Sequence, residues 1–353
     1  MRVQCFLALS LAAILPGFAQ QPASAGAVLP IGPREVFAAA APFYEFTSPE
    51  LKPWHLKAAY QLYDENGKPS EQGTFEYWWA SAKVHRGTWM RSGATRTEWE
   101  TGDGEFATDE SGKRLEYFEE QLRSAFLSPL PEAYVLNSNS LRMELEPASP
   151  KNNNMRCIKI VPLPGVQPLG VLGSLNPSST YCFDPVKPAL IANTSFGEIV
   201  TVFNKIAIVQ GKYLAREIEV LGINRKILTA TVDEITPLTP SDQILTPSAT
   251  AKIFKPEKDR QGTGVTVGQL LKKEQPVYPE IAKASHVSGT VILQGTIGLD
   301  GKIHDLRVVW TPSSILTSSA IEAVSHWKYR PYLLGGKPVE VETLVNVAYT
   351  LGK

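Results

Sequence analysis

The sequence predicts an α+β protein with a large antiparallel β-rich domain, a linker and a smaller α+β domain. Three observations lead to this prediction. Segments with alternating apolar residues follow one another from Leu56 to about Ile235, which places the β-rich domain at residues 40–235. The next segment, residues 236–275, is rich in Pro, Thr and charged residues and lacks periodicity, as linkers do. In residues 276–353, segments with helical and strand periodicity alternate.

The chain starts with a basic residue, an apolar run from Cys5 to Leu15 and then small residues. This pattern is typical of a secretory signal peptide, and we expect residues 1–19 to be removed by cleavage after Ala19, with Ala25 as the alternative position. An uncleaved run would associate the protein with the membrane, but a spanning helix needs about 20 apolar residues and this run is shorter. The sequence therefore predicts an exported protein.

The β-rich domain is predicted to begin with a hairpin. Asn66 and Gly67 lie between two strand-like segments, LKAAYQLY and GTFEYWWASAK, and the pair Asn-Gly is a strong hairpin signal. In the second segment Phe75, Tyr77 and Trp79 alternate onto one face. Similar segments continue as far as KILTATVDEI, which predicts a large antiparallel sheet with a wide aromatic face.

The segment KRLEYFEEQLRSAFLSPL interrupts these strands. Its apolar residues Leu115, Phe118, Leu122 and Phe126 recur at helical spacing until Pro129 ends the pattern. We expect a helix here that covers one face of the sheet.

Two cysteines remain after removal of the signal peptide, Cys157 and Cys182. An even pair in an exported protein favours a disulfide. Two buried free thiols are the alternative, and a CxxC spacing for metal or redox chemistry is missing.

The C-terminal domain is predicted to contain a short helix, YPEIAKAS, and a hairpin that turns at Asp300 and Gly301. The amphipathic segment SSILTSSAIEAVSHW is a helix that closes with Trp327, and Pro331 stops it. Two glycines then lead into the last strand, VEVETLVNVAYT. We therefore expect the aromatic run HWKYRPYLLGGKP to be a structural elbow whose Trp327 and Tyr329 pack in the core.

Several function classes find no support in the sequence. Thirty-five basic and thirty-five acidic residues give no net charge, so we expect no nucleic-acid partner. The five histidines show no metal-ligand spacing, and no phosphate or dinucleotide motif is present. No catalytic motif is present either, and the neighbouring acids Glu119 and Glu120 are expected on an exposed helix face. We therefore expect a non-catalytic protein without metal or cofactor.

Two segments, QPVYPEIAKASHVSGTVILQGTIGLDGKIHDLRVV and AIEAVSHWKYRPYLLGGKPVEVETLVNVAYTL, resemble the C-terminal domain of TonB-like energy transducers. The residues that match the family's motifs are Tyr278, Pro279, Ala282, Gly289, Val291, Asp300, Gly301, Ala323, Trp327, Lys328, Tyr329, Arg330, Pro331, Gly336, Lys337 and Pro338. The resemblance implies a two-layer α+β fold, a periplasmic location and a role in TonB-linked transport in the cell envelope. The membrane anchor and long Pro-rich span of proton-motive transducers are not matched, so the resemblance does not extend to energy coupling.

The resemblance also implies a binding site. In this family the exposed final strand accepts an extended peptide of an outer-membrane receptor, so we expect a TonB-dependent receptor or another envelope protein to dock here. An edge strand offers unpaired backbone groups for affinity and alternate side chains for specificity. The residues assigned to this docking edge are Val339, Val341, Thr343, Val345, Asn346, Val347 and Tyr349, with Glu340, Glu342 and Asn346 on its polar face.

The β-rich domain resembles the LolA/LolB-like half-barrels that carry lipoproteins or lipids, through its meander, its covering helix and the segment FNKIAIVQGKYLAREIEVLGINRKILTATVDEI. A half-barrel with Phe75, Tyr77, Trp79 and Trp89 on its concave side has the apolar surface to hold an acyl chain. A closed aromatic core without a ligand fits the same residues equally well. The alternative function is therefore a periplasmic carrier of lipid or lipoprotein.

Overall fold

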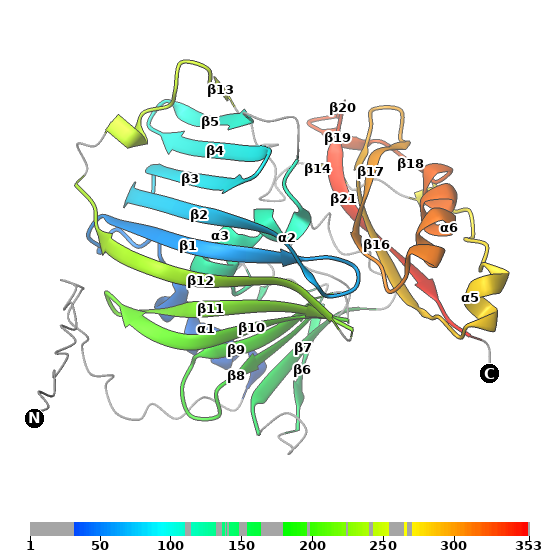
Figure 1. Cartoon of the computed structure of the whole chain (residues 1–353), viewed down its shortest axis with the longest axis horizontal. Coiled ribbons are helices and arrows are strands. Elements are labelled where there is room, and N and C mark those ends of the chain that lie inside the picture. The colour runs from blue at the N-terminus through cyan, green and yellow to red at the C-terminus, as the bar shows by residue number, and fades with distance from the viewer. Residues whose placement is uncertain are drawn as a thin grey trace, which may run out of the picture.

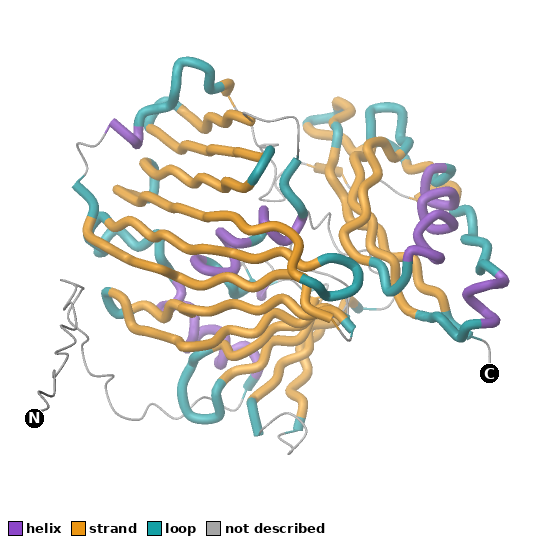
Figure 2. Tube along the Cα trace, in the orientation of Figure 1, coloured by secondary structure: helices purple, strands orange, loops and turns teal. Residues whose placement is uncertain are grey.

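The computed structural model describes residues 32–109, 114–131, 136–137, 139, 141–147, 154–163, 179–195, 198–223, 225–239, 243–253, 265–266 and 270–351. A large curled sheet with helices on its inner side stands next to a smaller α+β unit (Figures 1 and 2). The predicted signal peptide and its cleavage site lie outside the described residues. Within the described ranges, no helix has the length and apolar character needed to cross a membrane.

The described residues form thirteen strands of the large sheet. They are β1 (Trp54–Tyr63), β2 (Pro69–Ser81), β3 (Val84–Arg91), β4 (Ala94–Thr101), β5 (Gly104–Asp109), β6 (Leu141–Glu146), β7 (Arg156–Pro162), β8 (Ser179–Phe183), β9 (Leu190–Ser195), β10 (Ile199–Val209), β11 (Lys212–Gly222), β12 (Arg225–Pro237) and β13 (Lys252–Ile253). Their order is β13-β5-β4-β3-β2-β1-β12-β11-β10-β9-β8-β7-β6, so β13 and β6 are its two edges and the sheet does not close into a barrel. The predicted antiparallel β-rich domain is confirmed.

The first hairpin shows why this chain turns where it does. Asp64 accepts hydrogen bonds from the backbone N–H groups of Asn66 and Lys68 through Oδ1, both at 2.9 Å. Gly67 has a φ of 72°, which costs glycine little and other residues more. The predicted Asn-Gly turn therefore joins β1 to β2, and residues such as Ala58 and Phe75 face each other across the pair.

Among the described residues, three helices lie on the inner side of the curled sheet: α1 (Pro33–Tyr44), α2 (Tyr117–Glu120) and α3 (Leu122–Leu127). Phe126 of α3 stacks on Phe75, with ring centroids 6.1 Å apart. The helix expected between Leu115 and Pro129 is therefore present as two short helices that meet at Gln121, and its covering position is confirmed. The sequence reading missed α1, although its buried residues Val36, Phe37, Ala40 and Tyr44 recur at helical spacing after a proline at the helix start.

The described part of the predicted linker contributes to both units. β12 runs on to Pro237, a 3-10 turn spans Gln243–Leu245, and β13 pairs with β5. Two further short strands, β14 (Val265–Thr266) and β15 (Leu270–Lys272), pair with strands of the smaller unit. The domain limits themselves remain predictions.

The smaller unit has a three-stranded antiparallel sheet in the order β17-β16-β21. Its elements are α5 (Glu280–Ala284), β16 (Gly289–Ile297), β17 (Ile303–Trp310), α6 (Ser314–Ser325), β18 (Lys328–Tyr329), β19 (Tyr332–Leu334), β20 (Lys337–Val339) and β21 (Val341–Tyr349). Ser313 is the N-cap of α6, and its side chain accepts from the Ile315 N–H. The helix covers the face of the small sheet that points away from the large sheet (Figure 1). The predicted two-layer α+β domain is confirmed.

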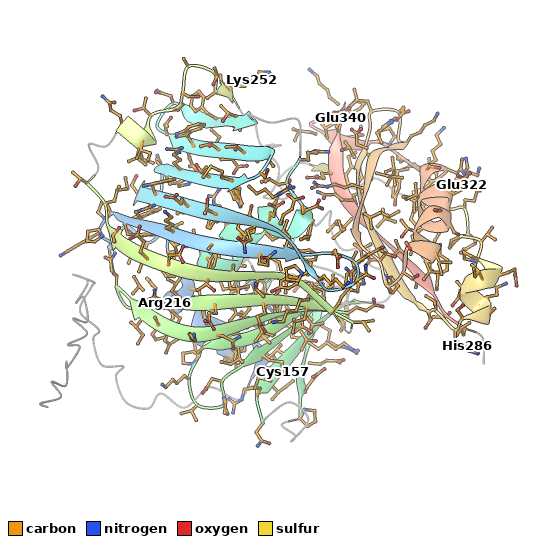
Figure 3. All side chains as sticks on the ribbon, in the orientation of Figure 1. Cys157, Arg216, Lys252, His286, Glu322 and Glu340 are labelled. Carbon is orange, nitrogen blue, oxygen red and sulfur yellow. A yellow bond between two sulfur atoms is a disulfide. The ribbon has the colours of Figure 1, made fainter. Side chains whose placement is uncertain are left out.

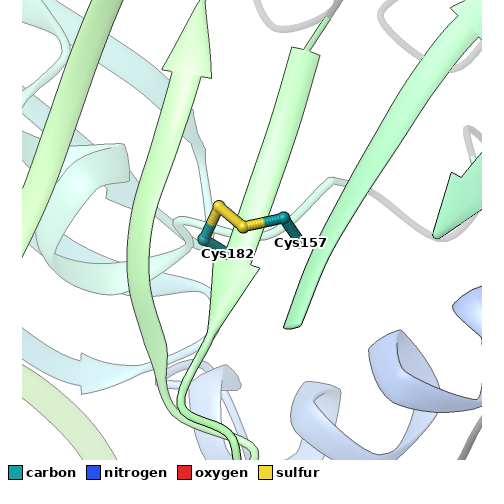
Figure 4. Close-up of a disulfide and its surroundings, with 2 residues drawn as sticks. All are labelled: Cys157 and Cys182. Carbon is teal, nitrogen blue, oxygen red and sulfur yellow. A yellow bond between two sulfur atoms is a disulfide. The ribbon is translucent and has the colours of Figure 1, made fainter. Parts of the chain in front are cut away.

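Cys157 of β7 and Cys182 of β8 lie directly opposite each other in the antiparallel register. Their sulfur atoms are bonded, and the Cα atoms are 4.0 Å apart (Figure 4). The predicted disulfide is therefore present in the structure, where it joins neighbouring strands next to the β6 edge.

Candidate functional site

The candidate site is strand β21, which pairs with β16 on one side and ends the sheet on the other. Its side chains alternate between two faces. Those of Val341, Val345, Val347 and Tyr349 are at most 5% exposed and pack in the core under α6. Thr343 shares this face and is half-buried. Val339 belongs to β20 and pairs with Tyr332, so the structure starts the edge strand at Val341.

Two hydrogen bonds of the neighbouring strand β16 show which backbone N–H and C=O groups of β21 point outward. The N–H of Thr290 donates to the Glu198 carboxylate at 3.0 Å, and the N–H of Gly298 donates to the Lys302 carbonyl at 2.9 Å. Both groups point away from β21, and backbone direction alternates along a strand. The backbone N–H and C=O groups of the even-numbered residues of β16 therefore point away from β21.

Even-numbered residues of β16 pair with even-numbered residues of β21, for example Thr290 with Ala348. In an antiparallel ladder such a pair turns the backbone groups of both residues away from each other. The N–H and C=O groups that face outward from β21 therefore belong to Glu342, Leu344, Asn346 and Ala348. Those of Val345 point toward β16.

The even-numbered side chains of β21 lie on the face that points toward the large sheet. Leu344 packs against the hydrophobic core of the N-terminal domain. Asn346, predicted on a polar face, is half-buried, whereas Glu340 and Glu342 are exposed. Glu340 lies just before the start of β21 (Figure 3). The predicted polar face is therefore partly covered by the N-terminal domain.

Trp310 at the end of β17 anchors the contact between the two domains. It is 2% exposed and belongs to the core cluster of the N-terminal domain. Its indole N–H donates to Glu198 at 3.2 Å, and the Arg225 guanidinium lies 4.4 Å above its ring. A Cβ at Gly222 would lie 2.0 Å from the indole, so only glycine permits this approach.

Arg307 of β17 forms a second contact between the domains. Its Nη2 donates to Glu120 of α2 at 2.8 Å, its Nη1 to the Leu115 carbonyl at 3.2 Å and its Nε to Gln294 at 2.6 Å. Gln294 in turn donates to Glu342 of β21. Burial raises the pKa of Glu120, although Arg307 acts in the opposite direction.

The residues that carry the resemblance build the frame of the domain rather than the outer edge of β21. Tyr278 donates to the Val287 carbonyl at 2.7 Å, and Pro279 is the N-cap of α5. Gly289 has a φ of 133°. Asp300 accepts from the Lys302 N–H at 2.9 Å.

The elbow near the C-terminus has a similar framing role. Trp327 is 5% exposed, and its indole N–H donates to the Glu274 carbonyl at 2.8 Å. The N–H of Tyr329 donates to the Gly301 carbonyl at 2.7 Å, and a Cβ at Gly301 would collide with the Tyr329 carbonyl. Pro331 follows β18, and Gly336, with a φ of 81°, turns the chain into β20. Trp327 and Tyr329 therefore support the core, as the sequence predicts.

The predicted apolar ligand face is filled by the protein itself. Phe75, Tyr77, Trp79 and Trp89 are all at most 3% exposed and belong to one core cluster with α3. Within the described residues, the indole N–H groups of Trp54, Trp79 and Trp89 have no hydrogen-bond partner.

The expectation that Glu119 and Glu120 lie on an exposed helix face is wrong, because Glu119 is buried and Glu120 is half-buried against Arg307. The Glu119 side chain accepts from Arg91 and Tyr60, so the acids of α2 point in two directions. Glu119 interrupts the apolar stripe of the helix, so the sequence pattern placed it outside. Its burial depends on Arg91, which lies at the end of β3 and faces it, and the sequence pattern does not show this contact. The described residues contain no cluster of His, Cys, Asp and Glu that could hold a metal ion.

These features describe a curled antiparallel sheet next to a small α+β unit whose three-stranded sheet ends in β21 on one side and in β17 on the other. Residues 274–351 match the family described as Gram-negative bacterial TonB protein C-terminal. The TonB C-terminal resemblance of this segment is therefore confirmed.

Two relatives share this segment, and both are called Protein TonB. The one from Pseudomonas aeruginosa is 36% identical over 70 residues, which are 20% of this chain and 20% of the relative. The one from Vibrio cholerae is 34% identical over 80 residues, which are 22% of this chain and 32% of the relative. The chain thus matches a third or less of the length of these curated relatives.

Solved structures resemble the two parts separately. The solution structure of the Pseudomonas aeruginosa TonB C-terminal domain is 30% identical, with a TM-score of 0.23, and covers 24% of this chain and 88% of its own. A putative outer membrane lipoprotein-sorting protein domain from Vibrio parahaemolyticus is 9% identical, with a TM-score of 0.38, and covers 60% and 94%. A LolA superfamily protein from Nitrosomonas europaea is 8% identical, with a TM-score of 0.37, and covers 61% and 97%.

Proposed function

We propose that this protein is a non-catalytic periplasmic adaptor in TonB-linked envelope transport. Its C-terminal domain binds an extended peptide of an outer-membrane receptor, or of another envelope protein, which adds as a strand to β21. The observation that supports this most directly is the outer edge of β21, where alternate backbone groups point away from the sheet. Recognition by strand addition needs such an edge.

A docking strand has to be held in place and has to offer free backbone groups, and β21 meets both requirements. The buried residues under α6 hold the strand in place, so little order has to be created when a peptide binds. The even-numbered positions carry both the outward backbone groups and the side chains that face the N-terminal domain. A peptide that pairs with them therefore lies beside that domain.

Amide hydrogen exchange of the full chain tests the proposal directly. Synthetic N-terminal peptides of outer-membrane receptors from the same genome are titrated into the protein. Strand addition should slow exchange at the outward amides of Glu342, Leu344 and Ala348, because they become donors to the peptide. A peptide that binds without slowing these amides docks elsewhere and contradicts the proposal.

The second candidate function is carriage of a lipid or lipoprotein inside the curled sheet. The three buried indole N–H groups favour it, because a buried donor without an acceptor costs about 1 to 3 kcal/mol and a polar ligand group would remove that cost. The aromatic side chains are packed against α3, so a ligand has to displace this helix. Native mass spectrometry of delipidated protein incubated with envelope lipids tests this function, and a spectrum with only the unbound mass contradicts it.

A further inference from the structure

Helix α2 lies between the core of the N-terminal domain and the docking strand. Its two neighbouring acids point to opposite sides. Glu119 bonds to Arg91 and Tyr60 of the large sheet, and Glu120 bonds to Arg307 of the C-terminal domain. Helix α2 therefore connects the two domains through neighbouring side chains.

The inner side of α2 is held firmly. Glu119 Oε1 accepts from Arg91 Nε at 2.7 Å and from the Tyr60 hydroxyl at 2.6 Å, and its other oxygen accepts from the N–H of Glu116. Arg91 also donates to the Arg114 carbonyl at 2.8 Å, just before the helix. These bonds fix α2 to the strands of the N-terminal sheet.

The outer side of α2 leads to β21 through two side chains. Arg307 donates to Glu120 and Gln294, and Gln294 donates to Glu342. Glu342 is one of the residues whose backbone groups face outward. The hydrogen bonds thus run without interruption from α2 to the docking strand.

The positive charge of Arg307 lies between two carboxylates of this hydrogen-bonded chain, Glu120 and Glu342. Glu120 and Glu342 come from different domains and are close enough to repel each other. The Arg307 cation lies against Glu120 and reaches Glu342 through Gln294, so it offsets this repulsion. Arg96 also acts on Glu120, but it belongs to the N-terminal sheet and does not join the two domains.

We propose that Arg307 is a positioning residue for the docking strand, through which helix α2 of the N-terminal domain sets the geometry of β21. This inference rests on the proposed function, because it assigns a control element to the same edge. The N-terminal domain then affects peptide affinity through the position of β21.

Three variants of the full chain separate charge from packing. Arg307→Met should weaken peptide docking about tenfold, because Glu120 and Glu342 lose the cation between them. Arg307→Met combined with Glu120→Gln should recover part of this loss, because one of the two carboxylates is gone. Arg307→Lys should lie between parent and Arg307→Met, because an ammonium keeps the charge but cannot repeat the three-directional contacts. Glu217→Gln, which removes the exposed ion pair with Lys205 between β10 and β11, is the matched control.

Exchange in the absence of peptide gives a second measure. The amides of Thr343 and Val345 are bonded to β16, so a displaced β21 should show faster exchange there in Arg307→Met and less so in the double variant. A purely packing role for Arg307 would give additive losses and no recovery. Parent-like docking and parent-like exchange in Arg307→Met overturn the inference.

The two proposals fail in different ways. If no peptide binds the parent chain, the proposed function fails, while the exchange rates of Thr343 and Val345 still decide whether Arg307 positions β21. If the parent binds and Arg307→Met is unfolded by circular dichroism, Arg307→Lys carries the comparison, and parent-like affinity and exchange in that folded variant overturn the inference.

Discussion

Arg91 and Glu119 form an ion pair inside the N-terminal domain, with 2.7 Å between Nε and Oε1. Their side chains are 1% and 0% exposed. Removal of one partner from a buried pair leaves the other charge without compensation, which typically costs about 3 to 5 kcal/mol. The pair therefore fixes α2 to the sheet, and loss of either partner should strongly destabilise the domain.

Arg91→Met should lower the free energy of unfolding of the N-terminal domain by about 3 to 5 kcal/mol. Urea denaturation followed by tryptophan fluorescence measures it. Arg91→Met combined with Glu119→Leu is the control, and we expect it to recover much of the loss because no charge stays buried. A single variant as stable as the parent contradicts the assignment.

The sequence predicted the elements that depend on local patterns and missed those that depend on contacts across the chain. Asn66 and Gly67 specify their turn through their own backbone preferences, so the hairpin was predictable. Glu119 was misplaced because its partners, Arg91 and Tyr60, are 28 and 59 residues away in the chain. Local periodicity carries no information about such partners.

For β21, too, the sequence predicted the local pattern and missed the contacts across the chain. Alternation along VEVETLVNVAYT indicated which side chains share a face, and the structure agrees for Val341 to Tyr349. Which backbone groups face outward depends on the register with β16 and on the Thr290 bond to Glu198, in a different domain. The contact of Leu344 with the N-terminal core was equally hidden, since a half-apolar strand gives no sign of what covers its other face.

Loss of the disulfide should destabilise the N-terminal domain by about 3 kcal/mol, because the bond closes a loop in the unfolded chain. The two cysteines are 25 residues apart in the sequence. The measurement compares urea denaturation of the parent with that of Cys157→Ser combined with Cys182→Ser. A reducing agent should lower the stability of the parent by a similar amount and leave the variant unchanged, and a reductant effect on the variant would point to a different cause.

Trp327→Ala should lower the free energy of unfolding of the C-terminal domain by about 3 kcal/mol or more, as expected for loss of a buried large aromatic side chain. Trp327→Phe keeps most of the apolar surface and loses the bond to the Glu274 carbonyl, so it should cost less. Thermal unfolding monitored by circular dichroism measures both. A fully stable alanine variant that fails only in docking would identify the elbow as a contact surface.

His85 should make the N-terminal domain less stable in mild acid. Burial lowers the pKa of His85 from 6.5 to about 3, and Arg123 acts in the same direction. Glu100 lies 2.9 Å away and favours the charged ring, but it is 34% exposed, so solvent screens its effect. The unfolded chain therefore binds this proton more readily than the folded chain does between pH 3 and 6.5.

It follows that the contribution of His85 to stability is complete above pH 6.5 and falls as the pH drops toward 3. Between pH 7 and pH 5 the loss should be about 2 kcal/mol. The measurement is the difference in unfolding free energy between these two pH values, in the parent and in His85→Gln. We expect the smaller difference in the variant, and an equal or larger one would mean that Glu100 keeps the ring charged.

Ala348→Pro should weaken peptide docking by at least about tenfold while the C-terminal domain stays folded. The N–H of Ala348 faces outward, so its loss removes no bond to β16, whereas an added strand loses a donor and meets the proline ring. Val347 before it is already extended, which the residue before a proline prefers.

Two neighbouring variants frame this result. Val347→Pro removes an N–H that bonds to β16 and places a ring in the core, so it should unfold the domain. Ala348→Ser keeps the N–H and should bind as the parent does. Titration of the full chain with the receptor peptides measures docking, and circular dichroism confirms the fold. If folded Ala348→Pro binds as tightly as the parent, β21 is not the docking edge, and the elbow from His326 to Pro338 becomes the better candidate for the site.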